Sequence, residues 1–361
     1  MATENNVNDL PLPKKNPLSL QIDLSKFEKA TDEEKKQQDV MSESTTFFKD
    51  GMRKLMKNPL AVGSIIVLIL IILMMIVTPH VVPYTYSQII TVDGKRDTGA
   101  KNLKPFQYSK MEQAYIAKGG KVFPHVMGTD ELSRDYFVRV VYGTRVSFMV
   151  GVFASLIVGI IGVLYGSISG YSGGKTDMIM MRIVDIIYSL PDLLVIILLS
   201  VVFKETLDFS KVPILQKLGA NMVSMFLVFG LLYWVGMARL VRGQILTIKE
   251  NEYVLAARAI GARPNRIIWH HILPNCISVI IISIALEIPS AIFTESYLSF
   301  IGLGVALPMP SLGALASDAR SGMQSYPLKL VFPALMIVLI VLAFNLLGDG
   351  LRDAFDPKLR K

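Results

Sequence analysis

Six apolar runs, each long enough to cross a lipid bilayer as a helix, constrain the fold of this chain more than any other feature. A transmembrane helix needs about 20 mostly apolar residues to cross the hydrocarbon core. The runs lie near 59–78, 146–170, 184–203, 218–238, 276–300 and 330–348. The sequence therefore predicts an all-α membrane protein with six transmembrane helices.

The composition agrees with a membrane protein. The chain of 361 residues is 52% hydrophobic and 18% charged, whereas soluble domains carry about 25% charged residues. The net charge of +8 is spread over the loops between apolar runs, without interleaved aromatic residues or a binding motif, so it does not indicate nucleic-acid binding. The single cysteine, Cys276, gives neither a disulfide framework nor a zinc-ligand spacing. We therefore expect a lipid bilayer, and no nucleic acid, around this chain.

The distribution of lysine and arginine predicts the orientation of the runs. Basic residues that flank membrane helices favour the cytoplasmic side. They gather before run 1, between runs 2 and 3, between runs 4 and 5, and after run 6: Lys49, Arg53, Lys54, Lys57, Lys175, Arg182, Arg239, Arg242, Lys249, Arg258, Arg263, Arg266, Arg352, Lys358, Arg360 and Lys361. Both termini are therefore expected in the cytoplasm.

The segments outside the runs predict four further regions. Residues 1–45 are polar and contain few aromatic residues, so we expect a disordered cytoplasmic tail. Residues 46–58 place apolar side chains on one helical face, which is typical of an interfacial helix and equally of a stop-transfer flank. An extracellular loop over 79–145 and a cytoplasmic loop over 239–275 interrupt the six-span domain 59–348.

Two of these regions carry more detailed predictions. In the extracellular loop, the alternation of charged and apolar residues over 128–148 favours an amphipathic helix along the outer interface. After the last run, Gly348 and Gly350 are expected to end the helix and to open a short charged tail, 349–361.

Small residues form two stripes along the second run. Gly162, Gly166 and Gly170 are four residues apart, and Gly151, Ser155 and Gly159 repeat the same spacing. Such stripes let helix backbones approach closely in lipid. We predict that this helix is packed within a bundle; the alternative is a groove that faces a substrate.

Three acidic residues within the apolar runs are candidates for a pathway or gating role. Ionisable side chains are costly in lipid and point to function. Asp192 follows Pro191, whose ring bends a helix. Glu287 lies near the middle of its run. Glu295 opens residues 295–320, where glycines and prolines predict a re-entrant or outer turn. The plain alternative for each is a structural role.

A fourth acid, Asp185, lies one helical turn from Arg182. The spacing of these two residues predicts an ion pair near the membrane surface.

The loop between runs 4 and 5 contains a helix-forming stretch, EYVLAARAIGARPNRIIWHHILPN, at residues 252–275. Acidic and polar residues at its start favour a helix N-terminus, and Gly261 is expected to end that helix. Pro264 favours a second start. The alanines of the first helix keep it slim, while tyrosine, leucine and isoleucine offer apolar contacts. The stretch therefore predicts a docking helix.

This stretch resembles the cytoplasmic EAA loop of permease subunits of binding-protein-dependent ABC importers. The resemblance rests on the small pair at 256–257, on Gly261 four residues later, and on the Leu-Pro pair at 273–274. The sequence differs from the EAA loop at two positions. Leu255 stands where the loop usually has glutamate, and His271 stands where the loop usually has an apolar residue.

Three other stretches resemble the C-type permease subunit of oligopeptide and dipeptide importers. They are GTDELSRDYFVRVVYGTRVSF at 128–148, the turn at 295–320, and NLLGDGLRDAFDPKLR at 345–360. With the docking loop, they occur in the order expected for that family and cover the chain from about residue 46 to residue 360.

The resemblance implies a fold and a set of partners. The fold is the MetI-like fold of type I ABC importer permeases. The partners are a homologous permease, two ABC ATPase subunits and an extracellular or periplasmic peptide-binding protein, in a bacterial cell (inner) membrane. The chain would be no enzyme and would bind no cofactor or metal, because ATP and Mg²⁺ belong to the ATPase subunits. The residues implied in ATPase coupling are Glu252, Tyr253, Leu255, Ala256, Ala257, Arg258, Ile260, Gly261, Arg263, Leu273 and Pro274.

No energy source is visible in the chain itself. Residues 169–176, SGYSGGKT, lack the first glycine of a phosphate-binding loop and end a membrane helix, whereas such a loop joins a strand to a helix. An alternative reading is an ion- or proton-coupled secondary transporter or channel that acts alone through Asp192 and Glu287. A membrane anchor or assembly factor, a third reading, would need neither acid.

Overall fold

The computed structural model describes residues 47–206, 222–304 and 309–355. The tail expected over 1–45 lies outside these residues, as does the last part of the tail 349–361. Within them, five helical stretches are long and apolar enough to cross a membrane. They are α3 (Pro59–Val81), α5 (Tyr136–Ser172), Met222–Ile248, Pro264–Phe300 and α14 (Leu328–Phe355). The expected all-helical membrane fold is confirmed.

Two of these stretches contain a π-helical turn. Met222–Ile248 includes η3 (Phe229–Tyr233) and α9 (Trp234–Ile248). Pro264–Phe300 is built from α11 (Pro264–Ile267), η4 (Ile268–Ile272) and α12 (Leu273–Phe300). Such turns are rare and are frequent at functional sites.

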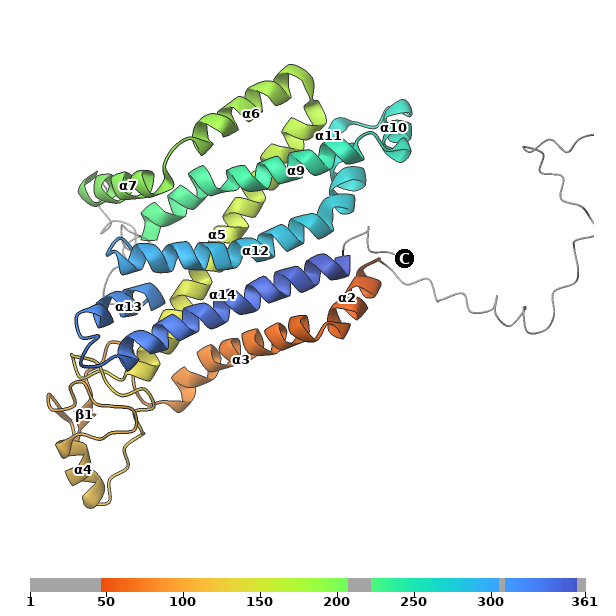
Figure 1. Ribbon diagram of the computed structural model, residues 1–361. Helices are drawn as coiled ribbons and strands as arrows, with labels where there is room; N and C mark the ends of the chain where they lie inside the picture. Colours follow the sequence, from red (N-terminus) through yellow and green to blue (C-terminus); the bar gives the residue numbers. More distant parts are fainter. Residues whose placement is uncertain (1–46, 207–221, 305–308, 356–361) are drawn as a thin grey trace, which may run out of the picture. The chain divides into compact units, whose positions relative to one another are not determined.

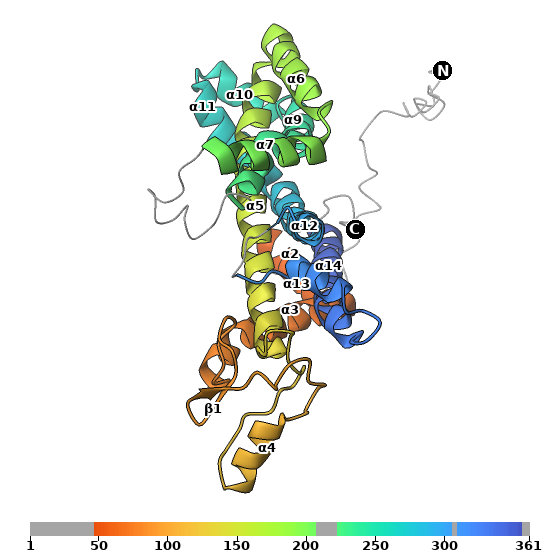
Figure 2. The same cartoon turned by 90° about the vertical axis from the view of Figure 1, so that its left-hand side faces the viewer.

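Helix α5 is the element on which the other helices pack. It has 37 residues, so at about 1.5 Å per residue it is about 55 Å long. Figure 1 shows α9, α12, α14 and α3 side by side in that order, with α5 crossing them. In Figure 2, α5 runs from the segment that holds α4 (Lys110–Ala117) to the end that holds α10 (Glu252–Ala259) and α11.

The third expected span, 184–203, is two helices rather than one. α6 (Gly174–Tyr188) and α7 (Asp192–Thr206) are separated at Pro191. Proline lacks a backbone N–H and its ring clashes with the preceding turn, so a helix rarely runs through it. The apolar run therefore folds as a bent pair of helices (Figure 2).

The segment 82–135 between α3 and α5 contains a hairpin, β1 (Thr91–Val92) and β2 (Lys95–Arg96), and the helix α4. A separate amphipathic helix over 128–148 was predicted here, and that prediction was wrong. Asp135 accepts a hydrogen bond from the Val138 N–H and starts α5 there, so residues from Tyr136 on form its first turns.

Helix α14 runs past the two glycines that were expected to end it. Gly348 lies against Leu286 of α12, and Gly350 lies against Ala61 of α3. These glycines serve close helix packing instead of helix termination, and α14 continues to Phe355. Near this end, α2 (Phe47–Lys57) occupies the position of the expected interfacial helix and buries Leu55.

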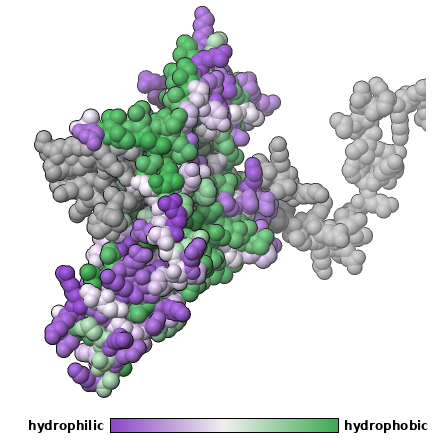
Figure 3. All heavy atoms as spheres, turned by 60° about the vertical axis from the view of Figure 1, so that its left-hand side comes forward, coloured by the Kyte–Doolittle hydropathy of each residue, from purple (hydrophilic) through white to green (hydrophobic). Residues whose placement is uncertain are grey.

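The break expected in the stretch 295–320 is confirmed. α12 ends at Phe300, and Gly302 follows with a φ of +87°, a conformation that suits glycine. Ser311 then caps α13 (Leu312–Arg320), a short helix before α14. Figure 3 shows apolar residues over the helices and hydrophilic residues over the segment 82–135 and the α10 end.

Candidate functional site

The helix α10 is held to the bundle by one face and exposes the other. Val254 and Ala257 are buried in the main hydrophobic core. Ile260, at the end of the helix, is 87% exposed, and Tyr253 and Leu255 are more than 40% exposed. An apolar surface of this kind, at the tip of a loop, is typical of a protein contact.

The other predicted coupling residues lie around this helix. Gly261 has a φ of +84° and ends α10, as expected. Arg263 precedes Pro264 at the start of α11. Leu273 is buried at the start of α12. The remaining predicted coupling residues that are exposed are Glu252, Ala256, Arg258 and Pro274.

Polar contacts fix α10 and α9 to the adjacent ends of α5 and α6. The guanidinium of Arg258 lies 5.8 Å from the ring centroid of Tyr171. Arg242 of α9 donates two hydrogen bonds of 2.5 Å to Asp177 of α6. Ser169 of α5 donates to the same carboxylate at 2.5 Å. Arg–carboxylate pairs of this two-pronged kind have a defined geometry, so these four elements form one junction.

The first glycine stripe of α5 lies against α9. A Cβ atom on Gly166 would be 2.5 Å from the carbonyl oxygen of Ala238, and one on Gly162 would be 2.5 Å from the Met237 Cβ. Gly170 is similarly close to Arg242. Only glycine permits this approach of two backbones.

The second stripe lies against α12. A Cβ atom on Gly151 would be 3.1 Å from the carbonyl oxygen of Ile288, and one on Gly159 would be 2.9 Å from the Ile284 side chain. Helix α5 therefore contacts closely both the helix that enters the docking loop and the helix that leaves it.

Asp192 and Glu287 both lie near Tyr233 of η3. The Tyr233 hydroxyl donates a hydrogen bond of 2.8 Å to Asp192 Oδ2. Glu287 and Tyr233 line a cavity of about 220 Å³, together with Ser155 and Ser283. The structure thus places two of the three predicted acids beside one tyrosine and one of them at a cavity.

Glu295 is fully buried and is separate from this pair. Ser147 of α5 donates a hydrogen bond of 2.6 Å to Glu295 Oε2, and Ser299 donates one of 2.7 Å to Oε1. Ser147 Oγ also accepts from the Leu312 N–H at 3.3 Å. In this conformation, Glu295 joins α5, α12 and α13.

Comparison with known proteins decides the family. The family described as binding-protein-dependent transport system inner membrane component matches residues 162–361, more than half of the chain. The chain belongs to this family. The family described as the N-terminal TM domain of oligopeptide transport permease C matches residues 46–105.

Individual relatives resemble this inner membrane component over most of its length. The oligopeptide transport system permease protein OppC of Bacillus subtilis (strain 168) is 38% identical over 322 residues, which cover 89% of this chain and 93% of that protein. The dipeptide transport system permease protein DppC of the same strain is 40% identical over 319 residues, 88% of each chain. OppC of Escherichia coli (strain K12) is 39% identical over 318 residues, 88% of this chain and 93% of that protein.

One predicted contact in this inner membrane component was wrong. Asp185 pairs with Arg239 of α9 at 2.8 Å, not with Arg182. The guanidinium of Arg239 also lies 4.5 Å from the ring centroid of Tyr188. Because α9 is distant in sequence, spacing along α6 could not identify the partner.

Sequence reasoning also missed two groups of charged residues. His125 lies between Glu112 and Asp135, and Arg139 is buried in the first turns of α5. An arginine among apolar neighbours was a visible signal. Among the described residues, no group of three or more His, Cys, Asp and Glu side chains is arranged to hold a metal ion.

Proposed function

We propose that this inner membrane component is the transmembrane permease subunit of an ATP-driven peptide importer. It would form the translocation pathway with a homologous permease and couple to two ABC ATPase subunits. An extracellular or periplasmic peptide-binding protein would deliver the cargo. Peptides are supported as cargo by the names of the relatives, which are oligopeptide and dipeptide transport system permease proteins.

The chain itself is not an enzyme in this proposal and binds no cofactor. ATP and Mg²⁺ are bound by the ATPase subunits, and the energy of hydrolysis reaches the membrane through protein contacts.

The basic residues support an orientation with the α10 end in the cytoplasm. Lysine and arginine gather in the loop that contains α10 and in α2 before the first span. Figure 1 shows α2, α10 and the end of α14 on one side of the membrane helices, and the segment 82–135 on the other. Both termini are then cytoplasmic, and the segment 82–135 lies outside.

The exposed apolar face of α10 is the observation that carries the proposal. Tyr253, Ala256 and Ile260 lie three and four residues apart, so they share one side of the helix. This side docks on an ATPase subunit, and the small alanine lets the helix backbone approach closely. Since Val254 and Ala257 fix an adjacent side of the helix in the core, movement of the ATPase moves α10 and the attached α9 together.

The glycine stripes of α5 carry that movement into the membrane. α9 and α12 each meet α5 at backbone distance, so a shift of α9 changes the position of α5 relative to α12. Asp192 and Glu287, beside Tyr233, line the pathway between these helices, and Glu295 holds α13 closed over it.

Co-purification with the ATPase subunits tests the proposal. We expect Ile260→Asp to reduce recovery of the ATPase at least tenfold, because the change places a charge within an apolar contact. Phe106→Asp is the matched control. Phe106 is also a large apolar residue that is 64% exposed, but it lies in the segment 82–135. That variant should retain the ATPase.

Two results would contradict the proposal. One is equal recovery of the ATPase with wild type and Ile260→Asp at equal amounts in the membrane. The other is uptake driven by an ion gradient in liposomes that contain this chain alone.

A further inference from the structure

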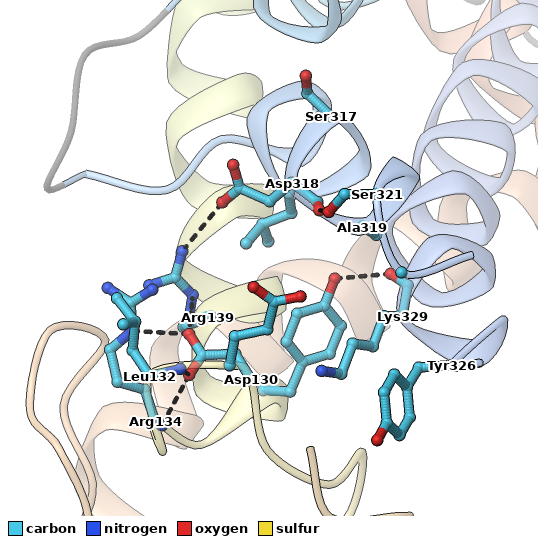
Figure 4. A pocket seen from close by; sticks show the side chains of 14 residues that line it. Asp130, Leu132, Arg134, Arg139, Ser317, Asp318, Ala319, Ser321, Tyr326 and Lys329 are labelled. Carbon is cyan, nitrogen blue, oxygen red and sulfur yellow. Dashed lines mark hydrogen bonds and ion pairs between the residues drawn. The ribbon is translucent and has the colours of Figure 1, made fainter. Parts of the chain in front are cut away.

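A pocket of about 490 Å³ lies at the end of the bundle that carries the segment 82–135. Its walls come from the end of the segment 82–135, from the start of α5, from α13 and from the residues around the start of α14 (Figure 4). The volume falls within the range of about 300–1,000 Å³ typical of small-molecule sites. It is distinct from the cavity at Glu287, with which it shares no lining residue.

The pocket is lined by a buried guanidinium, that of Arg139, whose hydrogen bonds are incomplete. Arg139 is 1% exposed. Its Nε lies 3.5 Å from Asp130 Oδ2, and its Nη2 lies 3.8 Å from Asp318 Oδ2. Both distances exceed those of N–H···O⁻ hydrogen bonds, about 2.7–2.9 Å. Nε and Nη1 have no hydrogen-bond partner among the described residues.

The two nearby carboxylates do not complete this site. Asp130 is already bonded to Arg134, whose Nε lies 2.7 Å from Oδ2 and whose backbone N–H lies 2.8 Å from Oδ1. The Asp318 side chain is 61% exposed, so water solvates much of it. A purely structural arginine would hold these acids at hydrogen-bond distance. Figure 4 shows the ion pairs from Arg139 to both acids, but its buried Nε and Nη1 have no hydrogen-bond partner among the described residues.

The two long ion pairs leave the bidentate hydrogen-bonding geometry of Arg139 unused. Leaving buried N–H groups of a charged side chain without hydrogen bonds is costly, and the planar fork of arginine matches a carboxylate. We propose that Arg139 binds the C-terminal carboxylate of a short peptide in this pocket, which gives the permease a peptide site of its own at the extracytoplasmic mouth. This inference rests on the proposed cargo and orientation, but it needs no ATPase.

Binding to the full chain in lipid nanodiscs tests the proposal. The probes are trialanine, trialanine with a C-terminal amide, and acetate, with binding followed by saturation-transfer NMR and titration. We expect trialanine to bind and its amide to bind at least tenfold more weakly. Equal affinity of the two peptides, equal affinity of trialanine and acetate, or no binding by folded wild type would each overturn the proposal.

Variants assign the site. Arg139→Gln should lose trialanine binding, whereas Arg145→Gln, with the same change six residues along α5 and outside this pocket, should retain it. Loss in both variants would overturn the assignment.

A further variant, at the exposed Asp318, tests the site without changing a buried residue. Asp318→Asn removes an exposed negative charge 3.8 Å from Arg139, so we expect severalfold tighter binding of trialanine and no change for the amide. Weaker or unchanged binding of trialanine would overturn the proposal. Co-purification of the ATPase should be unchanged in all of these variants. A failure of the peptide-site proposal can then be told apart from a failure of the proposed function, which would change ATPase recovery.

Discussion

His125 ties the segment 82–135 to the start of α5 through two buried carboxylates. Its Nδ1 lies 2.7 Å from Asp135 Oδ2, and its Nε2 lies 2.9 Å from Glu112 Oε1. A neutral imidazole has one N–H group, so two donated bonds require the protonated ring. Burial alone lowers the pKa of His125, but the hydrogen bonds to Asp135 and Glu112 outweigh burial and raise the pKa to about 9.

We predict that the segment 82–135 loses stability as the pH rises through about 9. The folded-state pKa lies above the ordinary value of 6.5, so the stabilisation is complete below pH 6.5 and is lost across the interval up to the folded-state value. A shift of this size corresponds to about 3 kcal/mol. Thermal unfolding in nanodiscs, followed by a fluorophore attached at position 118, would measure it between pH 6 and 10.

A glutamine at position 125 is the control for this titration. His125→Gln should be less stable than wild type at pH 6 and should show no such loss between pH 6.5 and 9. A wild-type melting temperature that stays constant over the whole interval would contradict the prediction.

At the scale of the helices, the close approach of α5 and α9 depends on single glycines. We predict that Gly166→Ala destabilises the chain by about 1–3 kcal/mol, because the new Cβ would lie 2.5 Å from the Ala238 carbonyl oxygen. Gly236→Ala is the matched control: it lies on α9 with open space around it, and alanine favours helix by up to about 1 kcal/mol. Thermal unfolding followed by circular dichroism compares them, and equal effects would contradict the packing argument.

The helices themselves could largely be predicted from the sequence, because long apolar runs have few alternatives to a membrane helix. Their boundaries could not. Asp135 starts α5 ten residues before the apolar run, because its side chain caps a helix whose first turns carry Arg139 and Arg145 among apolar residues. Gly348 reads as a helix end in sequence, but it faces Leu286 in the bundle. A glycine that permits packing and one that ends a helix look alike until the neighbouring helix is known.

At the scale of the whole molecule, the pairing of distant residues was beyond sequence reasoning. Asp185 forms an ion pair with Arg239, and Arg139 lies between Asp130 and Asp318. These pairs depend on which helices lie side by side. The docking helix α10 was predictable because its caps, alanines and glycine are contiguous, so local rules suffice.

At the same scale, we predict that transport depends on the backbone conformation at Gly261. Its φ is +84°, and open space surrounds the position that a Cβ would take, so strain rather than crowding limits substitution. We predict that Gly261→Val abolishes peptide uptake, because a β-branched residue is disfavoured at this φ, while Gly261→Asn retains most uptake. Uptake of labelled tripeptide by cells with equal membrane levels of each variant measures this, and normal uptake with valine would contradict it.

The serine hydroxyls that surround Glu295 constrain how the sequences of related permeases can change during evolution. Replacing the acid alone would leave the buried Ser147 hydroxyl without its acceptor, and replacing Ser147 alone would remove one of the hydroxyl donors of the buried acid. Lineages should therefore exchange these positions as a set, and ancestral reconstructions that change one residue without the other should yield protein that fails to accumulate.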